Sequence, residues 1–395
     1  MPSLPLGVPS DIDPYFYNRK KELISLNSFI NTLNQNVANQ ILVTGYRGVG
    51  KSFLLKKFIK DIPDNILTAY IDISHIYGTQ KGNLREEQIM QVLLEEMNNA
   101  IRDEDDILKK SYNAVKDLLW KIRKKNYDFK EAGSILGIAI PDINDNYQKL
   151  SKFVMEYPQK IVDKSDGQIN GFVIVIDEFQ FIGTLNSPEA FLWLFRSSTQ
   201  EQDNVSYIFT GSTSTTSEIV DKINGINGAF GNRMIQFNVD PFTKKDTKSY
   251  LKEKVPEIQF TDSGLERFYN CTRGYPAYIN SFCNIMSADI IYSEKEVIDE
   301  FYGKLEQVAV KWITTWSSLS NHEKCIVSTI IENGPLKWNE LLKKVDFSDG
   351  TLNKNLIKLK NKGILSHSDK LYKIDDHMLS AWIKYKKEQD GFYPP

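Results

Sequence analysis

Cysteine is scarce in this chain of 395 residues, which contains only Cys271, Cys283 and Cys325. An odd number of widely spaced cysteines argues against a disulfide scaffold and lacks the paired spacing of a zinc site. Long apolar runs are missing too, since stretches such as Phe172–Ile176 are far shorter than the roughly 20 residues that span a bilayer. The N-terminus has Pro and Gly where a signal peptide needs an apolar run. We therefore expect a soluble, cytoplasmic protein that does not enter a membrane.

The chain also lacks an excess of charge of either sign. It has 49 Lys and Arg against 51 Asp and Glu, which gives a net charge of −2. Binding of nucleic acid over the whole surface is therefore not expected, although a local basic patch stays open. The apolar share of 41% and the length are typical of a globular protein with two or three domains.

Five short apolar runs predict β-strands. They are Gln40–Thr44, Ile66–Ile73, Phe172–Ile176, Val205–Thr210 and Met234–Val239. The runs are nearly continuous rather than alternating, and helical segments separate them, which is typical of a parallel sheet covered by helices on both faces. The predicted fold class is therefore α/β, with a core at residues 38–240 that follows a lead segment at residues 1–37.

One connection in this core is unusually long. Residues 76–170 contain charged amphipathic segments, Glu86–Arg102 and Ile107–Lys125, and a strand signal only at Ser134–Ile140. We interpret them as a helical insertion whose role the sequence does not indicate.

Two further units follow the core. Residues 241–310 show helical periodicity, with caps at Thr243 and Thr261-Asp262, and no further strand signal, so we expect a small helical lid. Residues 311–395 read as three helices and a hairpin, the order of a winged helix-turn-helix. These five elements are Asn321–Glu332, Trp338–Val345, Thr351–Lys362, Ile364–His367 and Lys370–Ile374.

The strongest chemical signal lies between the first strand and the helix Phe53–Ile59. Its sequence, Gly-Tyr-Arg-Gly-Val-Gly-Lys-Ser, fits the phosphate-binding pattern G-x-x-x-x-G-K-[ST] in the strand–loop–helix context that the pattern requires. Glycines let successive N–H groups surround a phosphate at the positive end of the helix. Lys51 is expected to contact the β- and γ-phosphates, and Ser52 to ligate Mg²⁺. The predicted nucleotide-binding residues here are Gly45, Tyr46, Arg47, Gly48, Val49, Gly50, Lys51, Ser52 and Phe53.

The third strand delivers Asp177 and Glu178 at its carboxyl end, where ligands of an open α/β sheet bind. Asp177 would hold Mg²⁺, directly or through water, and Glu178 would polarise the attacking water. The base-reading motif Asn-Lys-x-Asp of GTPases does not occur in the sequence, which favours ATP and ADP as ligands. The fourth strand ends in Thr210-Gly211-Ser212, and Thr210 or Ser212 fits a sensor of the γ-phosphate, although a plain strand-to-turn junction is equally compatible.

With these motifs the chain resembles the archaeal-type ATPases of the STAND branch of the AAA+-related P-loop NTPases, and more distantly the winged-helix replication initiators. The Phe16–Leu23 segment, the P-loop, Asp177-Glu178, Thr210–Ser212 and Gly274-Tyr275-Pro276 carry the resemblance. It implies that Phe16 and Tyr17 pack beside the adenine, that Arg19 is a structural or phosphate-side contact, and that Pro276 touches the base. It also suggests Arg196 as an arginine finger acting on a neighbouring subunit. Arg233 would either contact the γ-phosphate or pair with an acid on the surface.

The expected function is therefore a slowly hydrolysing, Mg²⁺-dependent ATP switch that acts on another protein or on a second copy of itself. Two alternatives stay open. One is a DNA-binding initiator, transposition or plasmid-maintenance ATPase, because Lys354, Lys358 and Lys362 share the outer face of a helix whose apolar face is Leu352, Leu356 and Leu359, with Ile357 alongside. Residues 311–395 have 14 Lys against 10 Asp and Glu, an excess of four positive charges. The other alternative is a scaffold that keeps ADP bound and does not hydrolyse.

Overall fold

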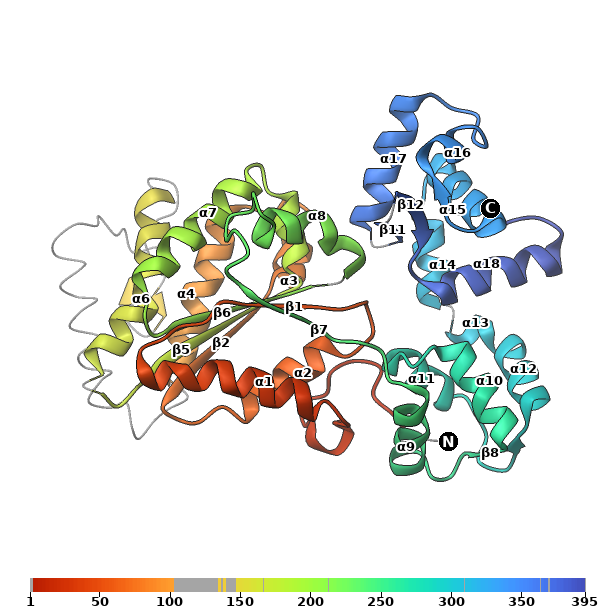
Figure 1. Cartoon of the computed structure of the whole chain (residues 1–395), viewed down its shortest axis with the longest axis horizontal. Helices are drawn as coiled ribbons and strands as arrows, with labels where there is room; N and C mark the ends of the chain where they lie inside the picture. Colours follow the sequence, from red (N-terminus) through yellow and green to blue (C-terminus); the bar gives the residue numbers. More distant parts are fainter. Residues whose placement is uncertain are drawn as a thin grey trace.

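The computed structural model describes residues 3–102, 134–135, 138–139, 147–165, 167–211, 213–308, 310–362, 364–368 and 370–394. Figure 1 shows an α/β part built on one sheet beside a mainly helical part, and both chain termini lie on the helical side. The strands of the α/β part are β1 (Ile41–Thr44), β2 (Ile66–Asp72), β5 (Gly171–Asp177), β6 (Val205–Thr210) and β7 (Ile235–Asn238). They coincide with the five apolar runs of the sequence, which confirms the α/β fold class.

These five strands form a single parallel sheet in the order β2-β5-β6-β1-β7. β6 therefore lies between β1, which precedes the glycine-rich loop, and β5, which ends in Asp177. The carboxyl ends of parallel strands share one edge of the sheet, so these two motifs and Thr210 meet there.

Helices cover both faces of the sheet, as the continuous apolar runs predict. The helices of the α/β part are α1 (Lys20–Asn31), α2 (Lys51–Lys60), α3 (Ile73–Thr79), α4 (Glu86–Arg102), α6 (Tyr147–Lys164), α7 (Pro188–Ser198) and α8 (Thr213–Asn224). Short 3₁₀ turns lie at Asp13–Tyr15, Thr32–Gln35, Phe179–Thr184 and Thr199–Glu201.

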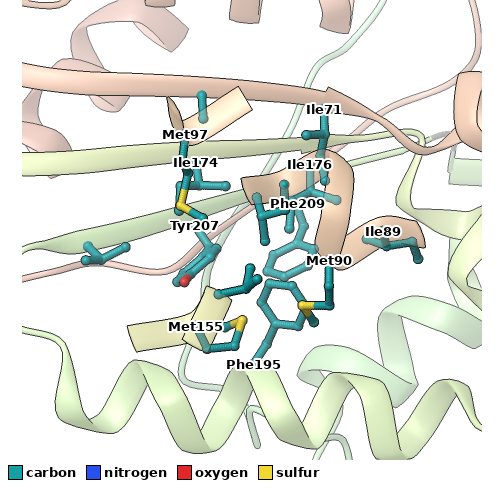
Figure 2. Packing of buried hydrophobic residues seen from close by; sticks show 14 of the residues in the cluster. Ile71, Ile89, Met90, Met97, Met155, Ile174, Ile176, Phe195, Tyr207 and Phe209 are labelled. Atoms are coloured by element: carbon teal, nitrogen blue, oxygen red, sulfur yellow. The ribbon is translucent and has the colours of Figure 1, made fainter. Parts of the chain in front are cut away.

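The alternation of side chains along β5 explains why both faces are apolar. Val173 and Val175 belong to the cluster that contains residues of α1 and α2, whereas Ile174 and Ile176 belong to the cluster on the opposite face. Figure 2 shows this second cluster, in which Phe209 of β6 packs with Ile174 and Ile176 and with residues of α4, α6 and α7. All of these residues are almost completely buried.

The long connection between β2 and β5 contributes to this core. Helix α4 has the bounds expected from the sequence, and both α4 and α6 bury apolar residues against β2, β5 and β6. The expected strand near Ser134–Ile140 is a short hairpin of β3 (Ser134–Ile135) and β4 (Ile138–Ala139). The predicted helix Ile107–Lys125 lies outside the described residues.

After Pro241 the chain forms α9 (Lys244–Lys254), α10 (Asp262–Thr272), α11 (Pro276–Cys283), α12 (Glu294–Gly303) and α13 (Leu305–Val308). Thr243 and Thr261 cap the first two helices, as their sequence predicts. The expectation of no further strands is wrong, because β8 (Gln259–Phe260) pairs in parallel with β9 (Ile291–Tyr292). Strands of two residues show no periodicity from which the sequence could have indicated them.

The remaining elements are α14 (Val310–Ser317), α15 (Asn321–Asn333), β10 (Leu336–Lys337), α16 (Trp338–Leu342), α17 (Asp349–Asn361), β11 (Leu365–Ser368), β12 (Leu371–Ile374) and α18 (His377–Asp390). The three strands form an antiparallel sheet in the order β10-β12-β11. Leu352, Leu356 and Leu359 on α17 are buried, but Ile357, expected beside them, is 52% exposed. One apolar cluster joins these elements to those of the preceding segment.

Candidate active site

The glycine-rich loop connects β1 to α2 at the carboxyl edge of the sheet. Gly45, Gly48 and Gly50 have φ angles of 151°, 87° and 95°, a backbone region that residues with a side chain rarely adopt. Val49 is fully buried and holds the loop against the core. The loop leads directly into α2, so it lies at the helix end that favours an anion.

Lys51, the first residue of α2, is folded back over the loop. Its ammonium group donates hydrogen bonds to the carbonyl oxygens of Gly45 at 2.8 Å and Tyr46 at 3.1 Å. Burial lowers the pKa of Lys51 to about 8, although the neighbouring carboxylates Glu178 and Asp177 oppose this shift. The structure thus brings the predicted lysine and both predicted acids into one electrostatic cluster.

Asp177 lies at the centre of three hydrogen bonds. Its Oδ2 accepts the hydroxyl of Ser52 at 2.8 Å and that of Tyr70 at 2.5 Å, and its Oδ1 accepts the backbone N–H of Glu178 at 2.8 Å. Ser52 and Asp177 therefore present hard oxygen donors side by side, the ligand type that Mg²⁺ prefers. Tyr70 is on β2 and could not be assigned from the sequence, because it stands inside an apolar run.

Glu178 begins the turn after β5 with a φ of 52°, which is unusual for a residue with a side chain. Burial and the adjacent Asp177 raise the pKa of its carboxyl group. The side-chain amide of Gln180 donates a hydrogen bond to Glu178 Oε2. Gln180 is a second residue of the site that no sequence motif indicated.

Thr210 ends β6 opposite Val43 of β1 and is completely buried. Its hydroxyl has no hydrogen-bond partner among the described residues. A buried polar group without a partner carries a desolvation cost of about 1–3 kcal/mol, so its presence beside the loop fits a functional rather than a purely structural threonine. The alternative sensor, Ser212, lies outside the described residues.

The segment before α1 ties the loop to the lid segment (residues 241–310). Arg19 donates to the carbonyl oxygen of Val49 at 2.9 Å, and its guanidinium lies 4.9 Å from the ring centroid of Phe242. Tyr17 packs edge-on against Phe242 and Tyr250, and Phe16 packs on the cluster around α2. Arg19 thus contacts both the glycine-rich loop and the lid segment.

The Gly274-Tyr275-Pro276 turn contacts the glycine-rich loop directly. The N–H of Ala277 donates to the carbonyl oxygen of Gly48 at 3.2 Å, and the rings of Tyr46 and Tyr275 lie 6.3 Å apart. A Cβ on Gly48 would lie only 3.0 Å from that of Ala277, so this approach depends on a glycine. Pro276 begins α11 at this contact.

A cavity continues from this contact into the C-terminal segment (residues 311–395). It is lined by Tyr46, Arg47, Tyr275, Tyr278, Trp312, Thr315, Lys362, Ile364, Asp375, Asp376 and Leu379. Asp376 accepts hydrogen bonds from the Tyr278 hydroxyl at 2.7 Å and the Trp312 indole at 2.8 Å. Three parts of the chain that lie far apart in sequence therefore meet beside the loop.

Two of the predicted cations lie elsewhere. Arg233 precedes β7 and lies at the edge of the sheet opposite the loop. Burial lowers the pKa of Arg196, and the positive charge of the nearby Arg233 lowers it further. Neither arginine is brought to Lys51. Lys362, expected on the outer face of α17, is exposed, but its ammonium pairs with the buried Glu323 at 2.9 Å.

The comparisons with known proteins agree with this geometry. Residues 16–282 match the family described as an ATPase domain predominantly from Archaea. The chain belongs to this ATPase family. No curated protein matches the chain. The matched region contains the glycine-rich loop, Asp177-Glu178 and the turn at Pro276, so the candidate active site lies wholly inside the family's domain.

Solved structures show the same P-loop fold around this ATPase domain. A Walker-type ATPase from Pyrococcus abyssi aligns with a TM-score of 0.63 at 16% identity, covering 95% of this chain and 98% of its own. The ORC2 protein of Aeropyrum pernix, solved in ADPNP–ADP complexes, aligns with a TM-score of 0.50 at 11% identity, covering 95% and 96%. A STAND protein from Pyrococcus horikoshii reaches a TM-score of only 0.35 at 16% identity, covering 92% and 42%, which is too low to support the STAND assignment.

Proposed function

We propose that this ATPase is a conformational switch that binds ATP between the core and the lid segment, hydrolyses it slowly and passes the nucleotide state to the C-terminal segment. The observation that carries the proposal is the position of the glycine-rich loop. Gly48 contacts α11 through Ala277, while Tyr46 and Arg47 face the cavity at Asp375 and Asp376. A change in this loop on nucleotide binding has direct contacts through which it reaches both segments.

In this proposal Lys51 turns from the loop carbonyls to the β- and γ-phosphates, and the loop N–H groups surround the phosphates. Glu178 orients and polarises the attacking water, and Thr210 donates to the γ-phosphate or to that water. Ser52 and Asp177 are the residues that would hold Mg²⁺, which supplies charge neutralisation of the phosphates when bound. Catalysis then consists of positioning and electrostatic stabilisation, without a covalent intermediate.

The base and ribose would lie near Phe16, Tyr17 and Pro276, the residues that connect the lead segment with the lid segment. Their contacts support this, because Tyr17 packs on Phe242 and Tyr250 of the lid segment. We assign residues 311–395 to a winged helix on the order of their elements and their antiparallel sheet. Its partner is then another protein or a second copy of this chain.

None of the described helices combines the length and apolar content that a bilayer crossing requires.

A DNA-binding function is the second candidate, and one observation favours it. Lys354 and Lys358 on α17 are exposed and lie opposite the buried Leu352, Leu356 and Leu359. Exposed lysines on one helix face can each neutralise a phosphate of a duplex. This surface is smaller than the sequence indicated, because Lys362 is paired with Glu323.

The switch is tested by hydrogen–deuterium exchange of the full chain with ATP, with ADP and without nucleotide. We expect ATP to slow exchange in the loop and in α11, and to change exchange in α14 and α18, which meet at Asp376. The variant Lys51→Ala is the control and should show none of these differences. Protection confined to the core would contradict coupling to the C-terminal segment while leaving nucleotide binding intact.

A further inference from the structure

We propose that Gln180 is a positioning residue that fixes the carboxylate of Glu178 for hydrolysis, in a space that Gly211 leaves open. This inference rests on the proposed role of Glu178 as the residue that orients the attacking water. It assigns a function to a residue that lies outside the recognised motifs.

The first observation is the hydrogen bond between the two side chains. The Gln180 amide donates to Glu178 Oε2, and the orientation of the amide follows because an ionised carboxylate only accepts hydrogen bonds. Glu178 has a left-handed backbone, and its carbonyl oxygen accepts the N–H of Phe181 at 3.2 Å. The tight turn thus places residues 178 and 180 so that their side chains meet.

The second observation concerns the neighbouring strand. A Cβ on Gly211 would lie 2.4 Å from Oε1 of Gln180 and 3.0 Å from the ring of Phe179. At such a separation one of the two groups must shift, and the end of the flexible Gln180 side chain is the group that would move. Gly211 therefore has a steric reason to follow Thr210, independent of any role in the turn.

The third observation is the position of unpaired polar atoms. Gln180 Oε1 and Thr210 Oγ1 are both buried and have no hydrogen-bond partner among the described residues. Gln180 thus lies between Glu178, which follows the end of β5, and Thr210, which ends β6. A side chain present only for packing would avoid the cost of a buried, unpaired carbonyl, and a methionine of similar volume would fill the space without it.

In this role Gln180 acts only through Glu178. The variant Gln180→Met retains volume and removes the donor. We expect it to lower kcat roughly 10-fold or more, within the usual range for a misplaced general base, and to leave the Kd for ATP unchanged. Gln180→His, which retains an N–H donor, should recover part of the lost kcat.

The deciding experiment is a double-mutant cycle of kcat with Glu178→Gln and Gln180→Met in the full chain. If Gln180 acts through Glu178, Gln180→Met has no further effect once Glu178 is Gln. An additive loss, or a Gln180→Met variant with parental kcat, overturns the proposal. If Glu178→Gln alone leaves kcat unchanged, the proposed function of Glu178 fails instead, so the two failures are distinguishable.

A second variant distinguishes the proposed effect on kcat from a folding defect. Gly211→Ala should displace Gln180 and reproduce the loss of kcat at unchanged ATP affinity, whereas Gly183→Ala, next to an open contact of 4.0 Å, should not. Thermal unfolding of each variant establishes that it is folded. Parental kcat in a folded Gly211→Ala variant would also contradict the proposal.

Discussion

The hydroxyl of Tyr70 donates a 2.5 Å hydrogen bond to Oδ2 of Asp177, the same oxygen that accepts the Ser52 hydroxyl. Tyr70 and Asp177 are 107 positions apart, yet β2 and β5 are neighbours in the sheet, and Tyr70 stands two residues before Asp72, which pairs with Asp177. Tyr70, which belongs to no recognised motif, therefore holds the carboxylate of the predicted metal ligand Asp177 in place.

Replacing Tyr70 by Phe should weaken Mg²⁺ binding without loss of nucleotide affinity. The ring remains, but Asp177 loses a donor that fixes its orientation, and such outer partners typically change metal affinity 10–100-fold. We expect an increase of about 10-fold in the Mg²⁺ concentration for half-maximal turnover. Binding of Mn²⁺ in the presence of ADP, measured by electron paramagnetic resonance, should weaken in parallel. Tyr77→Phe, on α3, is the matched control, and an equal response of both variants would contradict the assignment.

Lys51→Ala should weaken ATP binding at least about 10-fold, because the phosphates lose a buried, charged hydrogen-bond donor. Calorimetric titration with ATP measures the effect. Lys60→Ala removes an exposed cation from the end of the same helix and should bind ATP as the parent does. Parental affinity in Lys51→Ala would show that the loop is not the phosphate site.

Glu178→Gln should retain ATP affinity and slow turnover by roughly 10²-fold or more, the usual size of a general-base effect. The variant should consequently accumulate with ATP bound, which can be measured by separating bound nucleotides after a single turnover. Glu201→Gln changes an exposed acid in the 3₁₀ turn Thr199–Glu201 and serves as the control. Unchanged turnover would move the catalytic role to another residue.

The free energy of unfolding should depend on pH because of Asp375. Burial raises the pKa of its carboxyl group to about 6, while the Ser366 hydroxyl and Lys373 oppose the shift and Asp376 adds to it. Its Oδ2 is buried without a hydrogen-bond partner among the described residues. Since the folded pKa exceeds the unfolded value of 3.8, the folded protein favours the neutral acid. Stability is therefore lost as the pH rises from about 4 to about 6.

Asp375→Asn removes the ionisable group and should stabilise the protein by about 1–2 kcal/mol at pH 7, where the carboxylate would be charged. The difference should vanish near pH 4, where both side chains are neutral. Denaturant unfolding at the two pH values measures this, with Asp346→Asn, an exposed acid, as the control. A stabilisation of equal size at both pH values would contradict a titrating Asp375.

The DNA-binding candidate makes a separate prediction about α17. If this helix meets a duplex, Lys354→Glu with Lys358→Glu should weaken binding and reduce the salt slope, because each phosphate contact contributes roughly 0.9 to it. Turnover without DNA should remain parental. The matched control, Lys20→Glu with Lys21→Glu, makes the same charge change on exposed positions of α1. Equal duplex binding by both double variants would place the contact elsewhere.

The structure also limits what sequence patterns could predict at this site. Arg233 stands near a strand that ends at the site, but it precedes β7 and so lies at the opposite edge of the sheet. Lys362 continues the lysine spacing of α17, but its ammonium pairs with Glu323 of α15. For Lys362 the pattern predicted the local position, and a long-range contact determined its environment.

The sequence by itself determined the features that depend on neighbouring residues. Glycines at left-handed positions between a strand and a helix define the loop, and Thr243 and Thr261 cap the helices that they precede. Only the tertiary structure decided which strand ends are adjacent. The order β2-β5-β6-β1-β7 brings Tyr70 to Asp177 and Gln180 to Gly211. The physical reason is that strand order depends on packing both faces of the sheet at once, a free energy summed over distant residues that no local pattern contains.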